Sequence, residues 1–307
     1  MATVSFALVG FGNVGKAFIR LLQRKEQMLS SHYGLRFRVT GVATGRHGMA
    51  IDPNGLDLEK LLAAQDLSAL TRVPGLISVI DFIQHCPADV LFENSPVNHE
   101  DGQPAVDHIR AGLQRGMHVI TANKGPVVHA YAELMALAAD RGVCFKFEST
   151  VMDGAPIFSL FRGPLPLVEL EGFHGILNSC TNLILGRMET GESFEQAVAY
   201  AQSIGIAETD PSEDIDGWDA AVKTAALATV LMNAPMTPQM IDRTGIRAVT
   251  PQMIAQAAEA GERWKLVCRA HREGGEVRGV VAPQRVTPDS PLFAINGTSS
   301  YVQFESD

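Results

Sequence analysis

A glycine-rich turn near the start of the chain constrains the fold more than any other feature of the sequence. The apolar run Val4–Val9 has the composition of a buried strand, and the segment Gly10-Phe-Gly12-Asn-Val-Gly15 follows it directly. From Asn13 to Leu29 the apolar residues then recur at helical spacing. A strand, this glycine spacing and a helix, in that order, are typical of the first unit of a dinucleotide-binding fold.

Each glycine of the turn has its own physical reason. Gly10 allows a tight turn, Gly12 lets the backbone approach a pyrophosphate, and Gly15 lets the helix pack against the strand. The free N–H groups of the first helical turn would face the anion, so Asn13 and Val14 are also candidates for cofactor binding. The alternative interpretation is a glycine turn in an α/β domain that binds no nucleotide.

Short apolar runs alternate with helical patterns through the first half of the chain. The expected strands are 4–9, 36–43, 89–94, 118–121 and 143–148, and the expected helices are 13–29, 104–114 and 130–140. Strands that are apolar at nearly every position and are separated by helices predict a parallel sheet covered on both faces. We therefore predict an α/β, doubly wound Rossmann-type domain over residues 1–149.

The second half has a different pattern. The expected strands are 169–178, 265–270, 277–281 and 301–304, and the expected helices are 194–203, 216–232 and 251–260. This order predicts an α+β domain with a partly antiparallel sheet over residues 150–307. The edges of that sheet, expected near 169–178 and 277–281, need to be covered.

Composition excludes several classes of protein. The chain has 307 residues, of which 46% are hydrophobic and 19% charged, and a net charge of −9. This is ordinary globular composition. The net negative charge gives no indication of the basic surface that binds nucleic acid or an anionic membrane. No apolar run is long enough to span a membrane, and the N-terminus lacks the basic region of a signal peptide. Four widely spaced cysteines form no zinc motif and suit the reducing cytoplasm: Cys86, Cys144, Cys180 and Cys268.

The residues after the second expected strand, 36–43, indicate whether the cofactor is NAD or NADP. NAD-binding domains place an acidic residue there to hold the ribose 2′-hydroxyl. In this sequence no carboxylate follows the strand until Asp52, whereas Arg46 is available to pair with a 2′-phosphate. This pattern favours NADP over NAD. The alternative is that Arg46 is a solvated loop cation.

Two more expected strands end at the same edge of the sheet. Asn94 and Ser95 follow one of them, and Thr121 ends the other, with Lys124 three residues later. Ligands of doubly wound sheets lie at the carboxyl ends of the strands, so these residues are cofactor candidates. The alternative for Lys124 is a solvated lysine in a surface turn.

Six carboxylates precede a lysine in the segment from Glu208 to Lys223. Asp216 is expected to cap the helix that follows. Asp219 and Lys223 are then one turn apart on one face of this helix. Because residues 224–241 carry no charge, the helix is expected to be buried around most of its circumference. A lysine that enters such a helix beside a carboxylate is a candidate proton donor or acceptor; the alternative is a surface ion pair.

Motifs along nearly the whole chain resemble those of the homoserine dehydrogenase family. They are the glycine turn 10–15, Thr121-Ala-Asn-Lys-Gly, Glu148-Ser-Thr-Val-Met-Asp-Gly-Ala-Pro156, Gly175-Ile-Leu-Asn-Ser-Cys-Thr-Asn182, and Gly205-Ile-Ala-Glu208 through Asp219 to Lys223. They occur in the order of the family. The resemblance implies reversible, NAD(P)-dependent reduction of L-aspartate 4-semialdehyde to L-homoserine, a step in threonine and methionine biosynthesis.

The resemblance also implies roles for individual residues. Lys223 corresponds to the general acid/base, while Glu208 and Asp219 correspond to residues that hold the substrate, with Glu208 suited to its amino group. Lys124 corresponds to a lysine beside the nicotinamide and the substrate. The second half of the chain corresponds to a catalytic and dimerisation domain, which implies a homodimer formed through its sheet.

The segment from Glu148 to Ala155 resembles a turn that holds a monovalent cation, such as sodium, through backbone carbonyl groups. The matching positions are Glu148, Val151, Asp153 and Ala155. The alternative is a hinge between domains with a structural glycine.

The sequence departs from the family pattern at three places. Ser179 stands in a loop that usually reads Asn-Gly-Thr-Thr, and Ile206 stands where an aromatic residue is common. The sequence ends at Asp307, whereas family members usually continue through a glycine-rich turn into a further helix. The resemblance is to the monofunctional form, without a kinase or a regulatory domain.

Two other functions remain open at the level of sequence. One is a different NAD(P)-linked reductase that acts on an amino-acid-derived carbonyl compound. The other is a non-catalytic protein that senses NADP, although a sensor has no need of the Asp219 and Lys223 pair.

Overall fold

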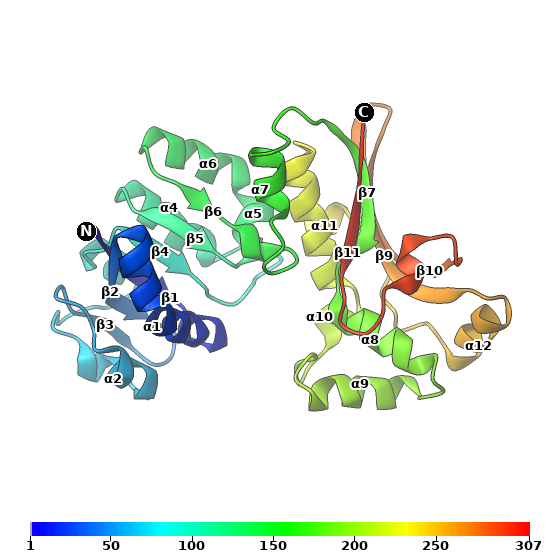
Figure 1. Ribbon diagram of the computed structural model, residues 1–307, viewed down its shortest axis with the longest axis horizontal. Helices are drawn as coiled ribbons and strands as arrows, with labels where there is room; N and C mark the ends of the chain where they lie inside the picture. The colour runs from blue at the N-terminus through cyan, green and yellow to red at the C-terminus, as the bar shows by residue number, and fades with distance from the viewer. Residues whose placement is uncertain (1) are drawn as a thin grey trace. The chain divides into compact units, whose positions relative to one another are not determined.

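A computed structural model describes residues 2–307, which divide into two compact units, one ending at Thr150 and the other beginning at Val151 (Figure 1). The sheet of the first unit has the strand order β3-β2-β1-β4-β5-β6. Its strands are β1 (Ala2–Val9), β2 (Leu35–Ala43), β3 (Met49–Ile51), β4 (Val90–Glu93), β5 (His118–Thr121) and β6 (Phe145–Lys146). All neighbours pair parallel except β2 and β3. The predicted parallel sheet is confirmed, and β3 is an antiparallel edge strand that the sequence patterns did not reveal.

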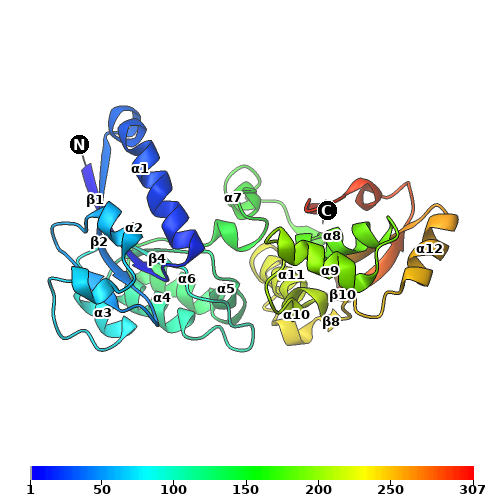
Figure 2. The ribbon, with the colours of Figure 1, turned by 90° about the horizontal axis from the view of Figure 1, so that it is seen from below.

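Helices cover both faces of this sheet, as the apolar strands require. They are α1 (Asn13–Tyr33), α2 (Leu58–Ala63), α3 (Val79–His85), α4 (Ala105–Gln114), α5 (Lys124–His129) and α6 (Tyr131–Asp140), with short 3₁₀ turns η1 (Leu67–Leu70) and η2 (Glu148–Thr150). Helix α1 lies on one face, whereas α4 packs against α3 and α6 on the other (Figure 2). Helix α1 is capped after Tyr33 by Gly34, whose backbone is left-handed and whose N–H donates to the carbonyl of Leu29.

The second unit contains a five-stranded sheet in the order β11-β7-β9-β10-β8. Its strands are β7 (Leu170–Ile176), β8 (Asp242–Arg243), β9 (Arg263–Glu273), β10 (Glu276–Val286) and β11 (Tyr301–Ser306). All pairs are antiparallel except β10 with β8. The partly antiparallel sheet is confirmed. The expected edge at 169–178 is wrong, because β11 and β9 flank β7; the edge expected at 277–281 is also not outermost, since β8 pairs with Val280 and Val281.

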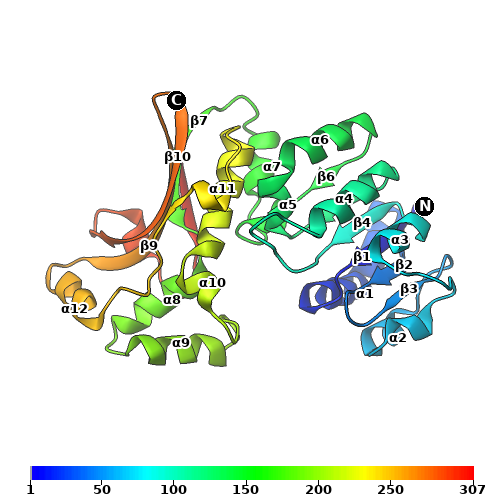
Figure 3. The same ribbon diagram turned by 180° about the vertical axis from the view of Figure 1, so that it is seen from behind.

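Helices α8, α11 and α12 pack against β9, and α9 packs against α8 (Figure 3). The helices of this unit are α7 (Ile157–Arg162), α8 (Ser179–Met188), α9 (Phe194–Ser203), α10 (Ser212–Ile215), α11 (Trp218–Leu231) and α12 (Pro251–Glu259), with 3₁₀ turns η3 (Pro238–Met240) and η4 (Pro291–Ala294). Most residues of α11 are buried, as its lack of charge predicted.

The expected cap of α11 is wrong. Gly217, in the left-handed region, precedes the helix without any side-chain cap. Asp216 instead ends α10, and its carboxylate accepts a hydrogen bond from Arg247 Nε at 2.9 Å. The chain must turn sharply between α10 and α11, and glycine is the residue that adopts this backbone conformation without strain.

Candidate functional site

The glycine turn after β1 has the geometry of an anion-binding helix start. A Cβ atom on Gly10, whose φ is +90°, would lie 2.3 Å from the carbonyl oxygen of Asn94, so only glycine fits there. A Cβ on Gly15 would lie 2.9 Å from the oxygen of Gly10. The space beside Gly12 is open, and α1 begins after it with neither a side-chain cap nor an acidic residue in its first turn. The N–H groups at Asn13 and Val14 can therefore face a phosphate.

A cavity of about 460 Å³ adjoins the glycine turn. Its lining residues come from the turn, α1, the β2–β3 loop, and the region from the end of α2 to the start of η1: Phe11, Lys16, Thr44, His47, Ala64, Gln65 and Leu67. The cavity combines apolar walls with a lysine and a histidine, which suits a purine nucleoside that carries an anionic group. Lys16 and His47 could not be identified from the sequence, because one is an ordinary helix residue and the other a loop residue.

Arg46 is exposed in the loop between β2 and β3. Thr44 closes this loop through its N–H and Oγ1, which both donate to the carbonyl of Gly48 at 3.1 Å. Asp52, the first carboxylate after β2, follows β3 and accepts a hydrogen bond from Arg72 Nε at 2.6 Å. The N–H of Asp52 donates to the carbonyl of Thr40 at 2.9 Å, so this residue lies beside the middle of β2 and not beside its last residue.

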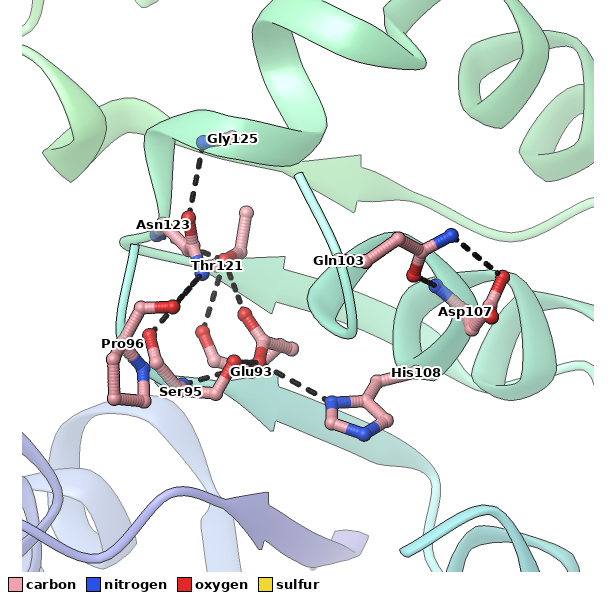
Figure 4. A network of polar contacts seen from close by, with 9 residues as sticks. All are labelled: Glu93, Ser95, Pro96, Gln103, Asp107, His108, Thr121, Asn123 and Gly125. Atoms are coloured by element: carbon pink, nitrogen blue, oxygen red, sulfur yellow. Dashed lines mark hydrogen bonds and ion pairs between the residues drawn. The ribbon is translucent and has the colours of Figure 1, made fainter. Parts of the chain in front are cut away.

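The loops that follow β4 and β5 are joined by hydrogen bonds (Figure 4). Thr121 Oγ1 donates to the backbone carbonyl of Glu93 at 2.9 Å and to its carboxylate at 3.1 Å. Asn123 Nδ2 donates to the carbonyls of Ser95 and Pro96 at 3.1 and 3.2 Å. Four predicted cofactor residues thus lie on two connected segments at one end of the sheet: Asn94 and Ser95 after β4, Thr121 at the end of β5, and Lys124 at the start of α5.

Lys124 is the first residue of α5 and is half-buried. Asn123 caps this helix by accepting a hydrogen bond from the N–H of Gly125 at 3.0 Å. No helix was predicted for this segment from the sequence, and the Asn123 cap fixes the position of Lys124 at the start of α5.

The second unit brings Lys223 and Asp219 together on the first turns of α11. Lys223 Nζ donates to Asp219 Oδ2 at 2.7 Å and to the carbonyl of Leu177, at the end of β7, at 2.8 Å. The two charged side chains are only 18% and 19% exposed. Their spacing was correctly predicted to place them on one face, and their burial argues against an ordinary surface ion pair.

Asn178 connects this pair to a second carboxylate. Its Nδ2 donates to Asp214 Oδ1 at 2.6 Å and to Asp219 Oδ2 at 2.9 Å. Its Oδ1 accepts from the N–H of Thr181 at 2.8 Å and thereby caps α8. Sequence reasoning singled out neither Asn178 nor Asp214. The asparagine before a helix was a readable cap signal, but one carboxylate among six could not be distinguished.

The buried environment shifts both kinds of charged group. Burial lowers the pKa of Lys223, but the charges of Asp219 and Asp214 outweigh it and raise the pKa of Lys223 above its usual value. Burial by itself would bring the pKa of this lysine toward neutral pH, and the two carboxylates reverse that effect. Burial also raises the pKa of Asp214, against the opposing effects of the Asn178 amide and the Lys223 charge.

Other predicted residues lie apart from this cluster. Glu208 is exposed in the loop after α9, where its backbone carbonyl accepts from Gln202 Nε2 at 3.1 Å. No contact among the described residues joins its carboxylate to Asp219 or Lys223. Ser179 Oγ lies 3.3 Å from Ser300 Oγ, and Ile206 is partly exposed.

The segment from Glu148 to Ala155 is a turn with two consecutive left-handed residues, Met152 at φ 56° and Asp153 at φ 50°. The N–H of Ala155 donates to the carbonyl of Met152 at 3.0 Å. Within residues 2–307, no group of three or more His, Cys, Asp or Glu side chains is placed to hold a metal ion. In the same range, no helix is long and apolar enough to cross a membrane.

Comparisons with known proteins agree over the whole chain. A family model described as "Homoserine dehydrogenase, NAD binding domain" matches residues 10–148, and one described as "Homoserine dehydrogenase" matches residues 156–307. An NAD(+)-dependent homoserine dehydrogenase from Pseudomonas canavaninivorans is 35% identical over 100% of this chain and 89% of its own. A homoserine dehydrogenase from Methanocaldococcus jannaschii is 37% identical over 98% of this chain and 89% of its own. The solved structure of a hyperthermophilic archaeal homoserine dehydrogenase in complex with NADPH has a TM-score of 0.81 and 26% sequence identity to this chain. The match covers 100% of this chain and 89% of that one.

Proposed function

Because the chain belongs to the homoserine dehydrogenase family of NAD(P)-binding oxidoreductases, we propose that it interconverts L-homoserine and L-aspartate 4-semialdehyde through the side chains gathered around Lys223. The observation that carries this proposal is the cluster of Lys223, Asp219, Asn178 and Asp214 at the start of α11. A buried lysine held between carboxylates is a suitable group for moving a proton to or from a substrate oxygen.

Two of the three N–H donors of Lys223 are directed to Asp219 and Leu177. The third is suited to the oxygen at the reacting carbon of the substrate. A bound nicotinamide cofactor would supply or take up the hydride at that carbon. In aldehyde reduction the ammonium of Lys223, which the raised pKa keeps protonated, gives a proton to the oxygen that becomes the new hydroxyl. Homoserine oxidation is the reverse of this step, in which the deprotonated amine of Lys223 receives the proton.

Charge balance supports binding of the amino acid at the same cluster. Asp214 and Asp219 share the amide of Asn178 and face one lysine. Two carboxylates with one ammonium favour a second cation, and the α-amino group of homoserine is one. We propose that Asp219 holds the substrate with Lys223, and that exposed Glu208 reaches the amino group when substrate is bound.

We propose that the glycine turn and the loops after β4 and β5 bind the dinucleotide, with Lys124 beside the nicotinamide. The open space at Gly12 and the adjoining cavity fit a pyrophosphate and an adenosine. NADP is the proposed cofactor, because Arg46 follows β2 and the first carboxylate, Asp52, is engaged by Arg72. The compared relatives differ on this point, since the name of one specifies NAD(+) and another was solved with NADPH.

The decisive experiment is a spectrophotometric assay of the purified protein with L-homoserine and either NADP or NAD, in which reduced nicotinamide is measured. We expect reduction of the cofactor that depends on homoserine. Fluorescence titration with NADPH under the same conditions separates the alternatives. Binding of NADPH without turnover would indicate a sensor, and turnover of another hydroxy amino acid in place of homoserine would indicate a different reductase.

A monovalent cation, such as sodium, is proposed at the backbone carbonyls of Glu148, Val151, Asp153 and Ala155. The left-handed residues Met152 and Asp153 support this, since consecutive residues of this kind mark a turn held in one particular shape. Activity measured in sodium chloride and in choline chloride tests it, and equal activity in both would reject the site.

A homodimer formed through the sheet of the second unit is also proposed. The edge strand β11 supports this, because an uncovered edge can pair with another chain. Light scattering that gives the mass of a monomer at assay concentrations would contradict it. The cytoplasm is the proposed location, supported by four free cysteines.

A further inference from the structure

A fully buried carboxylate lies where two cofactor loops leave the first sheet. Glu93, the last residue of β4, is 0% exposed, and among the described residues no lysine or arginine forms an ion pair with it. Burial of a carboxylate is costly unless its oxygens are well supplied with donors. The donors that Glu93 has therefore indicate its role.

One oxygen of Glu93 holds the loop after β4. The N–H of Ser95 donates to Glu93 Oε1 at 3.1 Å, and the hydroxyl of Ser95 donates to the same oxygen. The other oxygen holds the loop after β5, because Thr121 Oγ1 donates to Glu93 Oε2 at 3.1 Å. Thr121 Oγ1 in turn accepts from the N–H of Asn123 at 2.9 Å. The two oxygens of one side chain thus serve two different loops (Figure 4).

His108 of α4 is the third partner of this carboxylate. Its side chain is 8% exposed, and its Nδ1 lies 3.5 Å from Glu93 Oε1. This nitrogen has no hydrogen-bond partner within residues 2–307. The Nδ1 edge of the ring therefore contacts the carboxylate from the helix side without forming a hydrogen bond with it, and it does not compete with the loop donors.

We propose that Glu93 is a positioning residue for the dinucleotide, which holds the Ser95 loop and the Thr121 loop at a fixed separation, with His108 supporting its carboxylate. This inference rests on the proposed function, because it takes these two loops as the cofactor-binding loops. Glu93 does not touch the cofactor. It fixes Asn94 and Ser95 on one side, and Thr121 with the start of α5 on the other, before the cofactor arrives, so that little ordering is left for binding.

The test compares Glu93→Ala and Glu93→Gln with Thr40→Val by fluorescence titration of the full chain with NADPH. Thr40 is the matched control: it is also buried in the first sheet, and its Oγ1 donates to the carbonyls of Phe6 and Pro87, away from the two loops. We expect the Kd for NADPH to rise at least about 10-fold in Glu93→Ala, the scale of a lost charge-assisted hydrogen bond. Glu93→Gln should give a smaller rise, because its amide still offers an acceptor to Ser95 while its NH₂ cannot accept from Thr121. The KM for homoserine should stay nearly constant in both.

A Kd for Glu93→Ala equal to the wild-type value, or an equal rise in Thr40→Val, would overturn the proposal. If Glu93→Ala does not fold, the Kd for NADPH of Glu93→Gln is compared with that of Thr40→Val, and an equal Kd for the two would overturn the proposal. The cycle of Ser95→Ala and Thr121→Val adds an independent measurement, because loops coupled through Glu93 give non-additive changes in Kd, whereas additive changes would contradict the coupling. Failure of the wild-type protein to bind NADPH would instead reject the proposed cofactor site itself.

Discussion

The two units build their sites in different ways. In the first unit the proposed cofactor residues follow the ends of β1, β2, β4 and β5, so each lies within a few residues of a strand end. In the second unit the cluster around Lys223 combines the end of β7, the start of α8, α10 and the first turns of α11. Parallel strands carry their ends to one edge by topology, whereas the second site depends on packing between separate helices.

This difference predicts that substitutions in the two units change different kinetic constants. Changes in the first unit should act on the KM or Kd of the cofactor. Changes in the second unit should act on the KM of homoserine or on kcat.

The largest expected effect is that of Lys223→Ala. Loss of the proton-transfer group should lower kcat about 10²–10⁴-fold, with little change in the Kd of NADPH. Steady-state assays and fluorescence titration measure the two quantities, with Lys124→Ala as the matched lysine variant from the first unit. A near-normal kcat in Lys223→Ala, together with a loss of kcat in Lys124→Ala, would reverse the roles of the two lysines. It would also contradict the division of roles between the two units.

A large effect on stability is expected at Lys265, which is 0% exposed in the second unit. Its Nζ donates to Asn182 Oδ1 at 3.0 Å and to the carbonyl of Ile295 at 2.6 Å. Burial and the nearby charge of Arg263 lower the pKa of Lys265 to about 8. The unfolded chain keeps this proton up to its ordinary pKa of 10.5, so between these values it binds more protons than the folded chain, and stability contributed by this group rises with pH.

Lys265→Met should remove that dependence. Denaturant unfolding between pH 8 and 10.5 should show the wild type gaining roughly 3 kcal/mol relative to the variant. A constant difference across this range would mean that Lys265 titrates normally in the folded protein. The matched surface control is Lys60→Met, since Lys60 is largely exposed and pairs only with Asp57 at 3.6 Å in the described chain.

Two asparagines allow a direct comparison of the two units, because each caps a helix and donates hydrogen bonds from its amide to site residues. Asn123 caps α5 and holds Ser95 and Pro96, whereas Asn178 caps α8 and holds Asp214 and Asp219. Asn123→Ala should raise the KM of the cofactor several-fold, because neutral hydrogen bonds are lost. Asn178→Ala should lower kcat/KM for homoserine roughly 10–100-fold, because two hydrogen bonds to carboxylates are lost.

Each asparagine variant serves as the control for the other, since both lose a helix cap worth about 0.5–2 kcal/mol. Thermal unfolding should therefore show similar losses of stability. If both variants change the same kinetic constant, the separation between the two units does not hold.

The most selective expected effect is that of Arg46→Ala, which should act on the choice of cofactor. Loss of a charge-assisted contact to the 2′-phosphate should weaken NADP binding by about 1–3 kcal/mol and leave NAD nearly unchanged. Titration with both cofactors measures this, and Lys16→Ala tests the neighbouring cation that lines the cavity. Equal losses for NADP and NAD in Arg46→Ala would remove this residue from cofactor selection.

Much of the first unit could be predicted from the sequence alone. The glycine spacing, the apolar strands and the strand ends at Asn94 and Thr121 are local patterns, and the parallel fold converts them into a common edge. The helical spacing of Asp219 and Lys223 and the burial of α11 could be predicted for the same reason, since both follow from a period of 3.6 residues.

Only the tertiary structure decided the rest. Asp214 and Asn178 are 36 residues apart, and no local pattern distinguishes this carboxylate from its five neighbours. The pKa of Lys223 is raised because two carboxylates from α10 and α11 lie beside it, although burial alone predicted the opposite. The order of the second sheet, with β11 beside β7, was equally hidden, because antiparallel pairing between strands distant in the chain depends on packing that no short segment encodes.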